Sequence, residues 1–395
     1  MAEWIECTLN DLGEIVGGAT PSTQREDYYG GDISWITPKD LSSLQGRYIS
    51  RGERNITKKG LASCSAQLMP PKTILFTSRA PIGYVAIAEQ TVCTNQGFKS
   101  IVPNAKVNPL FLYYLLVYNK EAIEAMGSGT TFKEVSGKAM RAVKVHIPSD
   151  MQSQIKIASL LDSIDSKIEA NAKLNDNLEQ QAQSYFQELF VDNASPEWTT
   201  GTISDLGTVV GGSTPSKAKP KYYTESGIAW ITPKDLSINK SKFVSHGEND
   251  ITELGLKNSS AAIMPEGTVL FSSRAPIGYI AIAAGEVTTN QGFKSVVPKP
   301  EIGTPFVYFF LKNTLPVIEG MASGSTFKEV SGSTMKNVPA VIPDAETLAK
   351  FSDFCAPIFA QQRILEEQNQ SLATLRDNLL PKLMSGEIDV SAIQL

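Results

Sequence analysis

Four short polar motifs occur twice in this chain, and their side chains carry hydrogen-bonding chemistry suited to a nucleic acid. TPKD supplies a lysine, SRAPIG an arginine, TNQGFK an asparagine, a glutamine and a lysine, and TFKE a further lysine. Asn and Gln can bond an adenine edge, and Arg and Lys can bond guanine or phosphate. The candidate DNA-binding residues are therefore Lys39, Arg79, Asn95, Gln96, Lys99 and Lys133, with a second set Lys234, Arg274, Asn290, Gln291, Lys294 and Lys328.

Each of these motifs also has a plain structural interpretation. TPKD resembles a turn, the arginine of SRAPIG fits a surface turn before a strand, and Asn95 and Gln96 fit turn-capping amides. A shared fold would preserve the same residues as a shared ligand would. Repetition therefore does not decide between the two interpretations.

A basic segment distinguishes the first copy of the repeat from the second. Residues 42–62 contain five cations, whereas the matching residues 237–257 lack this excess of positive charge. Phosphate contacts from Lys and Arg dominate the affinity of proteins for DNA. We therefore predict phosphate contacts by this segment, with a solvated hairpin as the alternative, and the residues concerned are Arg47, Arg51, Arg54, Lys58 and Lys59.

The residues that usually carry catalysis or bind metals are not duplicated with the rest of the chain. His146 and His246 are the two histidines, and their repeat partners are a valine and an arginine. The sequence has no phosphate-binding Walker loop, no HExxH and no GxSxG motif. Its four cysteines are scattered without metal-ligand spacing, which is typical of a reduced, cytosolic protein. We predict no catalytic residue, no metal site and no cofactor bound by this chain.

The motifs belong to a repeat as long as a domain. WITPKDL begins at Trp35 and again at Trp230, and most of the unit keeps this register of 195 residues. Short apolar runs bounded by Gly, Pro and Ser predict strands, and the apolar spacing of 109–126 predicts a helix. The sequence therefore predicts an α+β fold with two similar target-recognition domains, at residues 1–148 and 196–343.

A long helix is predicted after each domain, at residues 149–195 and within 344–395. Apolar residues recur there at steps of three and four among polar ones, so each helix needs a partner for its narrow stripe. We predict that the two form an antiparallel coiled coil of about 55–60 Å, with the domains inverted about a pseudo-twofold axis. The predicted pairing residues are Ile157, Leu161, Ile164, Ile168, Leu174, Leu178, Ile358, Leu365, Leu372, Leu375 and Leu379.

The charge is distributed in alternating blocks. The whole chain carries a net charge of −5, but the predicted helices hold the acidic excess and the two domains are mildly basic. A long, two-sided ligand such as duplex DNA suits two basic domains held at a fixed separation. No apolar run reaches the length of a membrane span, which again favours a cytoplasmic protein.

The complete layout resembles the specificity (S, or HsdS) subunit of type I restriction–modification enzymes. The resemblance rests on GGATPST and GGSTPS, the doubled WITPKDL and RAPIGY, the long helix that follows each IP, and the terminal LRDNLLPKLMSGEI. It implies a non-catalytic subunit whose two domains each read one half of a split DNA sequence, while the helices set the gap. It also implies two docked methylation subunits that use S-adenosylmethionine on adenine, and motor–nuclease subunits that use ATP and magnesium.

The two domains are more alike than those that members of this family often pair. We therefore predict that the half-sites are the same or nearly the same in inverted orientation, giving a quasi-palindromic target. Two alternatives belong to other functional classes. One is a protein-binding assembly scaffold without direct DNA readout, and the other is the DNA-recognition part of an adenine methyltransferase.

Overall fold

The structure, a computed structural model, describes residues 3–79, 81–129, 133–324 and 328–391. These residues divide into two compact units. Unit 1 contains residues 1–170 and 369–395, and unit 2 contains residues 171–368. The dividing lines fall inside the two long helices, so each unit joins one recognition domain to parts of both helices. The domain limits inferred from the sequence stay a prediction.

Unit 1 contains a five-stranded sheet with the order β2-β9-β6-β7-β5, in which β5 alone runs parallel to its neighbour. A second pair joins the first and last strands of the domain, β1 and β10. Its strands are β1 (Trp4–Thr8), β2 (Gly13–Gly17), β3 (Tyr29–Ile33), β4 (Trp35–Ile36), β5 (Tyr48–Ile49), β6 (Ile74–Phe76), β7 (Val85–Ala88), β8 (Cys93–Thr94), β9 (Lys99–Pro103) and β10 (Lys144–Pro148). Its shorter helices are α1 (Leu9–Leu12), η1 (Glu26–Tyr28), α2 (Pro38–Ser42), α3 (Lys58–Ala62), α4 (Pro109–Tyr118), α5 (Lys120–Ala125) and α6 (Gly137–Ala142).

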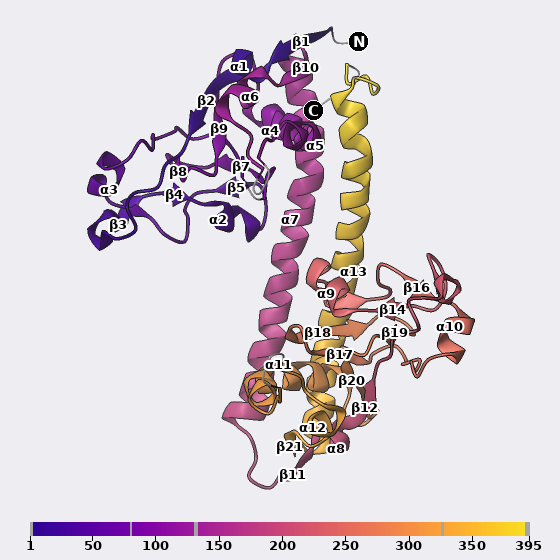
Figure 1. Cartoon of the computed structure of the whole chain (residues 1–395). Helices are drawn as coiled ribbons and strands as arrows, with labels where there is room; N and C mark the ends of the chain where they lie inside the picture. Colours follow the sequence, from indigo (N-terminus) through magenta and orange to yellow (C-terminus); the bar gives the residue numbers. More distant parts are fainter. Residues whose placement is uncertain (1–2, 80, 130–132, 325–327, 392–395) are drawn as a thin grey trace. The chain divides into compact units, whose positions relative to one another are not determined.

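Unit 2 repeats this topology. Its five-stranded sheet has the order β12-β20-β17-β18-β15, again with one parallel edge, and β11 pairs with β21 (Figure 1). Its strands are β11 (Thr199–Thr202), β12 (Gly207–Gly211), β13 (Tyr223–Thr224), β14 (Trp230–Ile231), β15 (Phe243–Val244), β16 (Asp250–Ile251), β17 (Val269–Ser273), β18 (Ile277–Ala283), β19 (Thr288–Thr289), β20 (Lys294–Pro298) and β21 (Pro339–Ile342). Its shorter helices are α8 (Ile203–Leu206), η3 (Pro220–Tyr222), α9 (Pro233–Ile238), α10 (Glu253–Lys257), α11 (Thr304–Gly320) and α12 (Gly332–Lys336). The duplication predicted from the sequence is thus present in the fold.

The sheet of each unit separates two apolar cores. Successive side chains of a strand point to opposite faces, so Ile74 and Phe76 of β6 join the core that contains α4 and the start of α7. Leu75 points the other way, into a core that lies beneath the loops that carry the repeated motifs. Unit 2 shows the same alternation, with Phe271 on the helix side and Leu270 on the loop side. The loops with the candidate contact residues therefore rest on a sheet that is packed on both faces.

Two long helices follow the domains, α7 (Met151–Gln187), which continues into a π-helical turn at Glu188–Asp192, and α13 (Ala345–Met384). In unit 1, Asn369 of α13 donates to the carbonyl oxygen of Ile168 at 3.2 Å, and Arg376 lies 2.8 Å from Asp165. In unit 2, Asn175 of α7 donates to Glu366 at 3.2 Å. Residue numbers rise along α7 as they fall along α13, so the paired segments are antiparallel within each unit.

The structure changes several details of the predicted helices. Leu174 and Leu375, both predicted in the pairing stripe, are 46% and 48% exposed, and the polar residues Asn171 and Gln362 are buried on these helices. The other predicted pairing residues are buried or partly buried. α13 begins twelve residues before Pro357, which lies within the helix. The helix predicted at 109–126 is broken at Asn119, whose side chain donates to Leu115 O and so ends α4.

Among the described residues, no helix combines the length and the apolar character that crossing a membrane requires.

Candidate nucleic-acid interface

Unit 2 brings four of the predicted contact residues to one polar pocket. The cavity has a volume of about 470 Å³. Its wall combines five loop segments that are far apart in sequence, and the residues concerned are Thr214, Lys217, Trp230, Thr232, Pro233, Lys234, Glu248, Asn249, Arg274, Ala275, Asn290, Gln291 and Gly292. The lining includes Lys234, Arg274, Asn290 and Gln291. Lys294 and Lys328 do not line the pocket. Lys328 is exposed and directly precedes Glu329, whose ion pairs are described below.

The TPKD motif forms the start of a helix rather than a free turn. Pro233 occupies the first turn of α9, where a missing N–H costs nothing. Asp235 accepts hydrogen bonds from the backbone and hydroxyl of Thr232, at 2.7 and 2.6 Å, which caps the helix. The same carboxylate accepts from the backbone N–H of Glu248 at 2.9 Å. Lys234 is thereby presented outward, 2.6 Å from the exposed carboxylate of Glu248.

The two amides of TNQGFK have different roles. Asn290 accepts from the backbone N–H of Gly292 at 2.8 Å, which is the turn-capping role left open by the sequence. Gln291 is exposed, and its oxygen accepts from the hydroxyl of Thr214. Gly212 lets its own loop approach the backbone of Asn290, because a Cβ on it would lie 1.9 Å from the Asn290 backbone oxygen. Thr214 thus orients the amide of Gln291, and its Nε2 donates to no other residue that the structure describes.

The SRAPIG and TFKE segments meet through one carboxylate. Glu329 lies 3.3 Å from Arg274 and 3.7 Å from Lys294. Arg274 keeps about a third of its side chain exposed, whereas Lys294 is largely covered. Burial lowers the pKa of Lys294, and Glu329 opposes that shift. Exposed ion pairs of this kind contribute little stability, so a phosphate or a base edge can compete for Arg274.

Unit 1 repeats these contacts at nearly the same distances. Lys39 lies 2.6 Å from Glu53, and Arg79 lies 3.1 Å from Glu134. Asn95 caps its turn at 2.8 Å, and Gln96 accepts from the hydroxyl of Thr20. Lys99 is largely covered, like its counterpart, and Lys133 is exposed. The repeated letters of the sequence therefore correspond to repeated side-chain geometry.

Four of the five cations predicted to contact phosphate are exposed on unit 1. Arg51 and Arg54 lie at the surface of the segment that leads into α3, and Lys58 and Lys59 lie at the surface of its first turn. The guanidinium of Arg54 is stacked over the ring of Tyr29 at 3.8 Å. These positions leave the prediction of phosphate contact intact for the four residues.

The fifth cation, Arg47, does not belong to the predicted phosphate-binding segment. The residue is 4% exposed, and its side chain points toward α7. The guanidinium lies 2.8 Å from Asp162 and 3.2 Å from Glu169, and it donates to the hydroxyls of Tyr114 and Ser166 at 3.0 Å each. A phosphate cannot reach a cation enclosed in this way. We therefore correct its predicted role from DNA contact to attachment of the domain to the helix.

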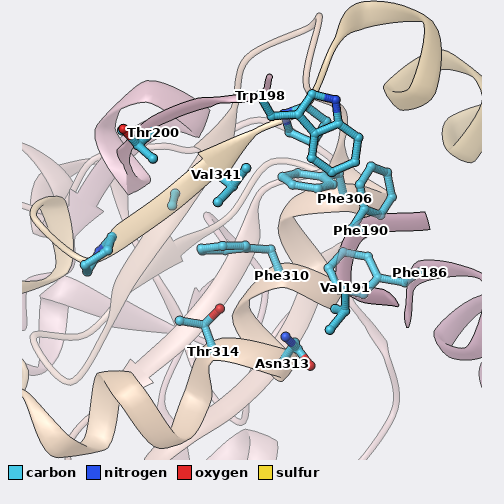
Figure 2. A pocket seen from close by; sticks show the side chains of 14 residues that line it. Phe186, Phe190, Val191, Trp198, Thr200, Phe306, Phe310, Asn313, Thr314 and Val341 are labelled. Atoms are coloured by element: carbon cyan, nitrogen blue, oxygen red, sulfur yellow. The ribbon is translucent and has the colours of Figure 1, made fainter. Parts of the chain in front are cut away.

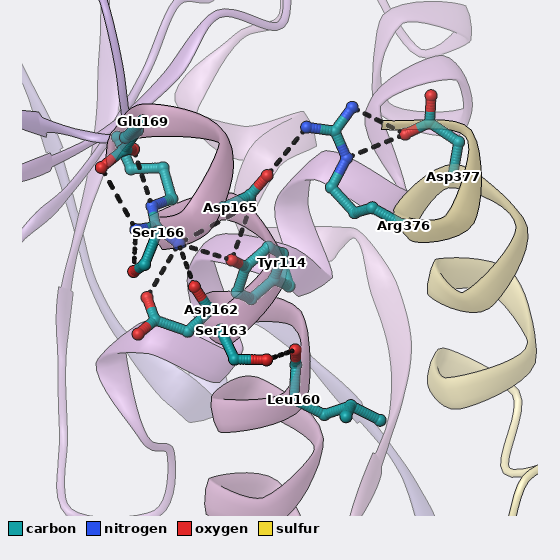
Figure 3. A network of polar contacts seen from close by, with 10 residues as sticks. Tyr114, Leu160, Asp162, Ser163, Asp165, Ser166, Glu169, Arg376 and Asp377 are labelled. Carbon is teal, nitrogen blue, oxygen red and sulfur yellow. Dashed lines mark hydrogen bonds and ion pairs between the residues drawn. The ribbon is translucent and has the colours of Figure 1, made fainter. Parts of the chain in front are cut away.

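Figure 3 shows the carboxylates of α7 that gather around this attachment, with Arg376 of α13 reaching Asp165. Burial would lower the pKa of Arg47, but Tyr114, Asp162 and Glu169 raise it overall. Burial, together with Asp165, raises the pKa of Tyr114. The network therefore consists of the charged guanidinium of Arg47, the carboxylates around it and the uncharged hydroxyl of Tyr114.

Unit 2 has a lysine at the same position of the repeat. Lys242 is buried and lies 2.6 Å from Glu179 of α7, and it donates to Gln362 of α13 at 2.7 Å. Burial lowers the pKa of Lys242 to about 8, although Glu179 opposes the shift. Burial would raise the pKa of Glu179, but Lys242 and Lys312 hold it at about 2. At this position of the repeat, each domain therefore places a buried cation against the polar face of the long helices.

Sequence reasoning missed several of these residues, and a signal was present for some of them. Within the basic segment, Arg47 is the one cation whose repeat partner, Lys242, is also a cation. That retention is typical of a structural role, whereas the other four cations are replaced in the second copy. Lys217 and Asn249 were missed because they differ between the copies, although both line the pocket of unit 2.

A second cavity, of about 400 Å³, is apolar and lies in unit 2 between the end of α7, α11 and the strands β11 and β21. Figure 2 shows Trp198, Phe190 and Phe306 gathered along one wall. The ring of Phe190 is 4.8 Å from that of Phe306 and 5.9 Å from that of Trp198. The lining has few hydrogen-bonding groups, so it lacks the chemistry of base readout.

Among the described residues, no group of three or more His, Cys, Asp or Glu is placed to hold a metal ion.

Comparison with known proteins relates this architecture to DNA specificity subunits. The family model described as the type I restriction modification DNA specificity domain matches residues 1–180 and 196–375. The MjaIX specificity subunit of Methanocaldococcus jannaschii is 32% identical, with 99% of this chain and 95% of that protein covered. The HindI specificity subunit of Haemophilus influenzae is 25% identical, with 98% of this chain and 100% of that protein covered.

A solved structure has a similar fold. The crystal structure of the type I restriction–modification S subunit from M. genitalium aligns with a TM-score of 0.62 and 18% identity, covering 97% of this chain and 96% of that chain. The two matches to one family model coincide with the two copies of the fold. The chain therefore belongs to the type I restriction–modification DNA specificity family, and it is a specificity subunit that recognises a DNA target.

Proposed function

We propose that this chain reads a bipartite and nearly palindromic DNA sequence, with each recognition domain reading one half. The observation that carries the proposal is the repetition of contact geometry in the two units. Lys39 and Lys234 have the same ion-pair distance, and Gln96 and Gln291 are oriented by equivalent threonines. Two surfaces with the same donors in the same arrangement select the same base edges.

The base edges that each domain can read depend on the hydrogen-bond donors that its exposed side chains offer. Gln96 and Gln291 offer an amide N–H pair, and Arg79 and Arg274 offer guanidinium groups whose partner carboxylates are themselves partly exposed. Phosphate contacts by lysines such as Lys133 position the domain on the duplex, and base contacts specify the sequence. The net charge of −5 does not oppose this binding, because the acidic excess lies in the helical segments.

The long helices are proposed to act as the spacer. Within each unit, α7 and α13 run antiparallel, which supports an antiparallel coiled coil that holds the two domains in inverted orientation. The buried cations Arg47 and Lys242 support this role, because each attaches its domain to a defined turn of the helices. The gap between the half-sites is then set by helix length, at about 1.5 Å for each residue.

The chain is proposed to act without catalysis of its own, as the DNA-reading part of a larger enzyme. Methylation subunits, two for each chain, would bring S-adenosylmethionine, and motor–nuclease subunits would bring ATP and magnesium. Leu174, Ile364 and Leu375 support docking along the helices, because they are 46%, 47% and 48% exposed on α7 and α13. Apolar side chains on a long helix are suited to contact by a partner helix.

Mapping of methylated adenines in the host genome, with and without this chain, tests the proposal. We expect one bipartite motif that disappears with the chain, with half-sites that are the same or nearly the same on opposite strands. Two unrelated half-sites would contradict the equivalence of the domains. A methylation pattern that does not depend on the chain would instead favour the protein-binding scaffold.

A further inference from the structure

The two reading surfaces differ at two of the positions that line the pocket. Every other lining residue of unit 2 has an identical partner in unit 1, but Lys217 replaces Thr23 and Asn249 replaces Arg54. All four of these residues are exposed. Any difference between the half-sites must therefore arise at these positions or outside the pocket.

Arg54 is held by an aromatic platform that both units share. In unit 1, Tyr29 donates to Pro21 O at 2.7 Å and meets Trp35 edge-on at 5.9 Å. The guanidinium of Arg54 lies 3.8 Å above the Tyr29 ring. Stacking of this kind fixes the plane of an arginine and leaves its N–H groups directed outward. Arg54 is thus pre-oriented for a bidentate contact.

Unit 2 has the same platform with a different residue at its edge. Tyr223 donates to Pro215 O at 2.6 Å and meets Trp230 edge-on at 5.6 Å. The position of Arg54 is taken by Asn249, which lines the pocket. An amide in place of a guanidinium changes the base edge that can be bonded. Arg bonds O6 and N7 of guanine, and Asn bonds N6 and N7 of adenine.

The positive charge moves to an adjoining loop in unit 2. In unit 1, Thr57 donates to Asp27 O at 2.9 Å, so the segments around residues 23–27 and 54–57 lie side by side. In unit 2 the equivalent bond joins Thr252 to Lys221 O at 3.0 Å. The first segment reads TQRED in unit 1 and KAKPK in unit 2. Lys217 therefore supplies a cation to the pocket from the other side of this junction.

We propose that Arg54 and Asn249 are specificity-determining residues that read the one base pair at which the two half-sites differ. Arg54 selects a G·C pair in the half-site of the first domain, and Asn249 selects an A·T pair at the equivalent place in the second. Lys217 restores the phosphate contact that the loss of the arginine removes. This inference rests on the proposed function, because it assigns bases within the half-sites that the function requires.

The test is methylome mapping in a host that contains the methylation subunits and a variant of the full chain. Thr23→Lys with Arg54→Asn gives the first domain the residues that the second domain has at these two positions. We expect the first half-site to change from G·C to A·T at one position, giving a perfect palindrome, with at least about tenfold lower methylation of the original site. The reciprocal variant, Lys217→Thr with Asn249→Arg, should give a palindrome of the other kind.

Lys58→Glu is the matched control, because it introduces the residue of the second copy at an exposed position outside the pocket lining. We expect it to weaken methylation without changing the motif. An unchanged motif in both double variants would overturn the inference and leave the proposed function standing. A wild-type chain that directs no bipartite motif would instead remove the proposed function itself.

Discussion

Replacement of Arg47 by alanine tests the corrected role of the most enclosed cation in unit 1. The residue is 4% exposed, and its guanidinium faces Asp162, Asp165 and Glu169. Removing one partner of a buried ion pair costs roughly 3–5 kcal/mol, because the other charge stays buried. Asp165 keeps Arg376 at 2.8 Å, and the other two carboxylates are partly exposed and can rehydrate. We therefore expect a loss near the lower limit, about 3 kcal/mol.

The assay is denaturant unfolding of the full chain, in which this loss appears as a lower midpoint at an unchanged slope. Lys58→Ala serves as the control, with an expected change in the free energy of unfolding within about 0.5 kcal/mol. DNA binding by the assembled complex gives a second readout. A lost phosphate contact lowers the slope of log affinity against log salt by about 1. We expect that decrease for Lys58→Ala and an unchanged slope for Arg47→Ala, and the opposite pattern would refute the correction.

Three further substitutions probe other parts of the structure. Glu179 has a pKa of about 2 in the folded chain against an ordinary 4.5, so its contribution of about 3 kcal/mol at pH 7 is lost as the pH falls. Glu179→Gln should therefore destabilise the chain more at pH 7 than at pH 4. Its free energy of unfolding should lie closer to that of the wild type by about 0.8 kcal/mol at pH 4 than at pH 7, and an equal difference at both pH values would contradict this. Asp40→Ala and Asp235→Ala each remove the N3 carboxylate of a capping box and should destabilise the chain by about 0.5–2 kcal/mol, the range for capping residues. They should also lower the affinity for DNA, and an unchanged affinity would show that the capping box does not position the reading loop. Phe186→Ala should cost about 3–5 kcal/mol in thermal unfolding, because the residue is 2% exposed within an apolar core of unit 2; a loss below about 1 kcal/mol would mean that this core repacks.

The repeat made most of the fold predictable. Identical motifs in one register imply two copies of one topology, and the two five-stranded sheets have equivalent strand orders. The apolar runs that end at the IP before each long helix form the strands β10 and β21. Helical periodicity predicted α7 and α13, because their apolar residues recur at the spacing that one helix face requires.

The roles of individual polar residues were harder to predict, because charge alone does not indicate burial. Arg47 lies in the same basic segment as Arg54 but points toward α7, a contact 115 or more residues away in sequence. Leu174 and Leu375 follow the apolar spacing, yet the helices bury polar residues such as Asn171. For Asn95 the sequence left base contact and turn capping both open, and its oxygen caps its own turn.

Competition binding with designed duplexes tests the central proposal that two equivalent domains read inverted half-sites. The assembled complex of this chain with its methylation subunits would be offered duplexes in which the second half-site is replaced by a copy of the first. We predict that the copy in inverted orientation binds within about tenfold to a hundredfold of the natural site, since one altered base pair costs roughly 1–3 kcal/mol. The same copy in direct orientation should bind no better than a duplex that keeps the first half-site alone, and equal affinity for both orientations would contradict the account.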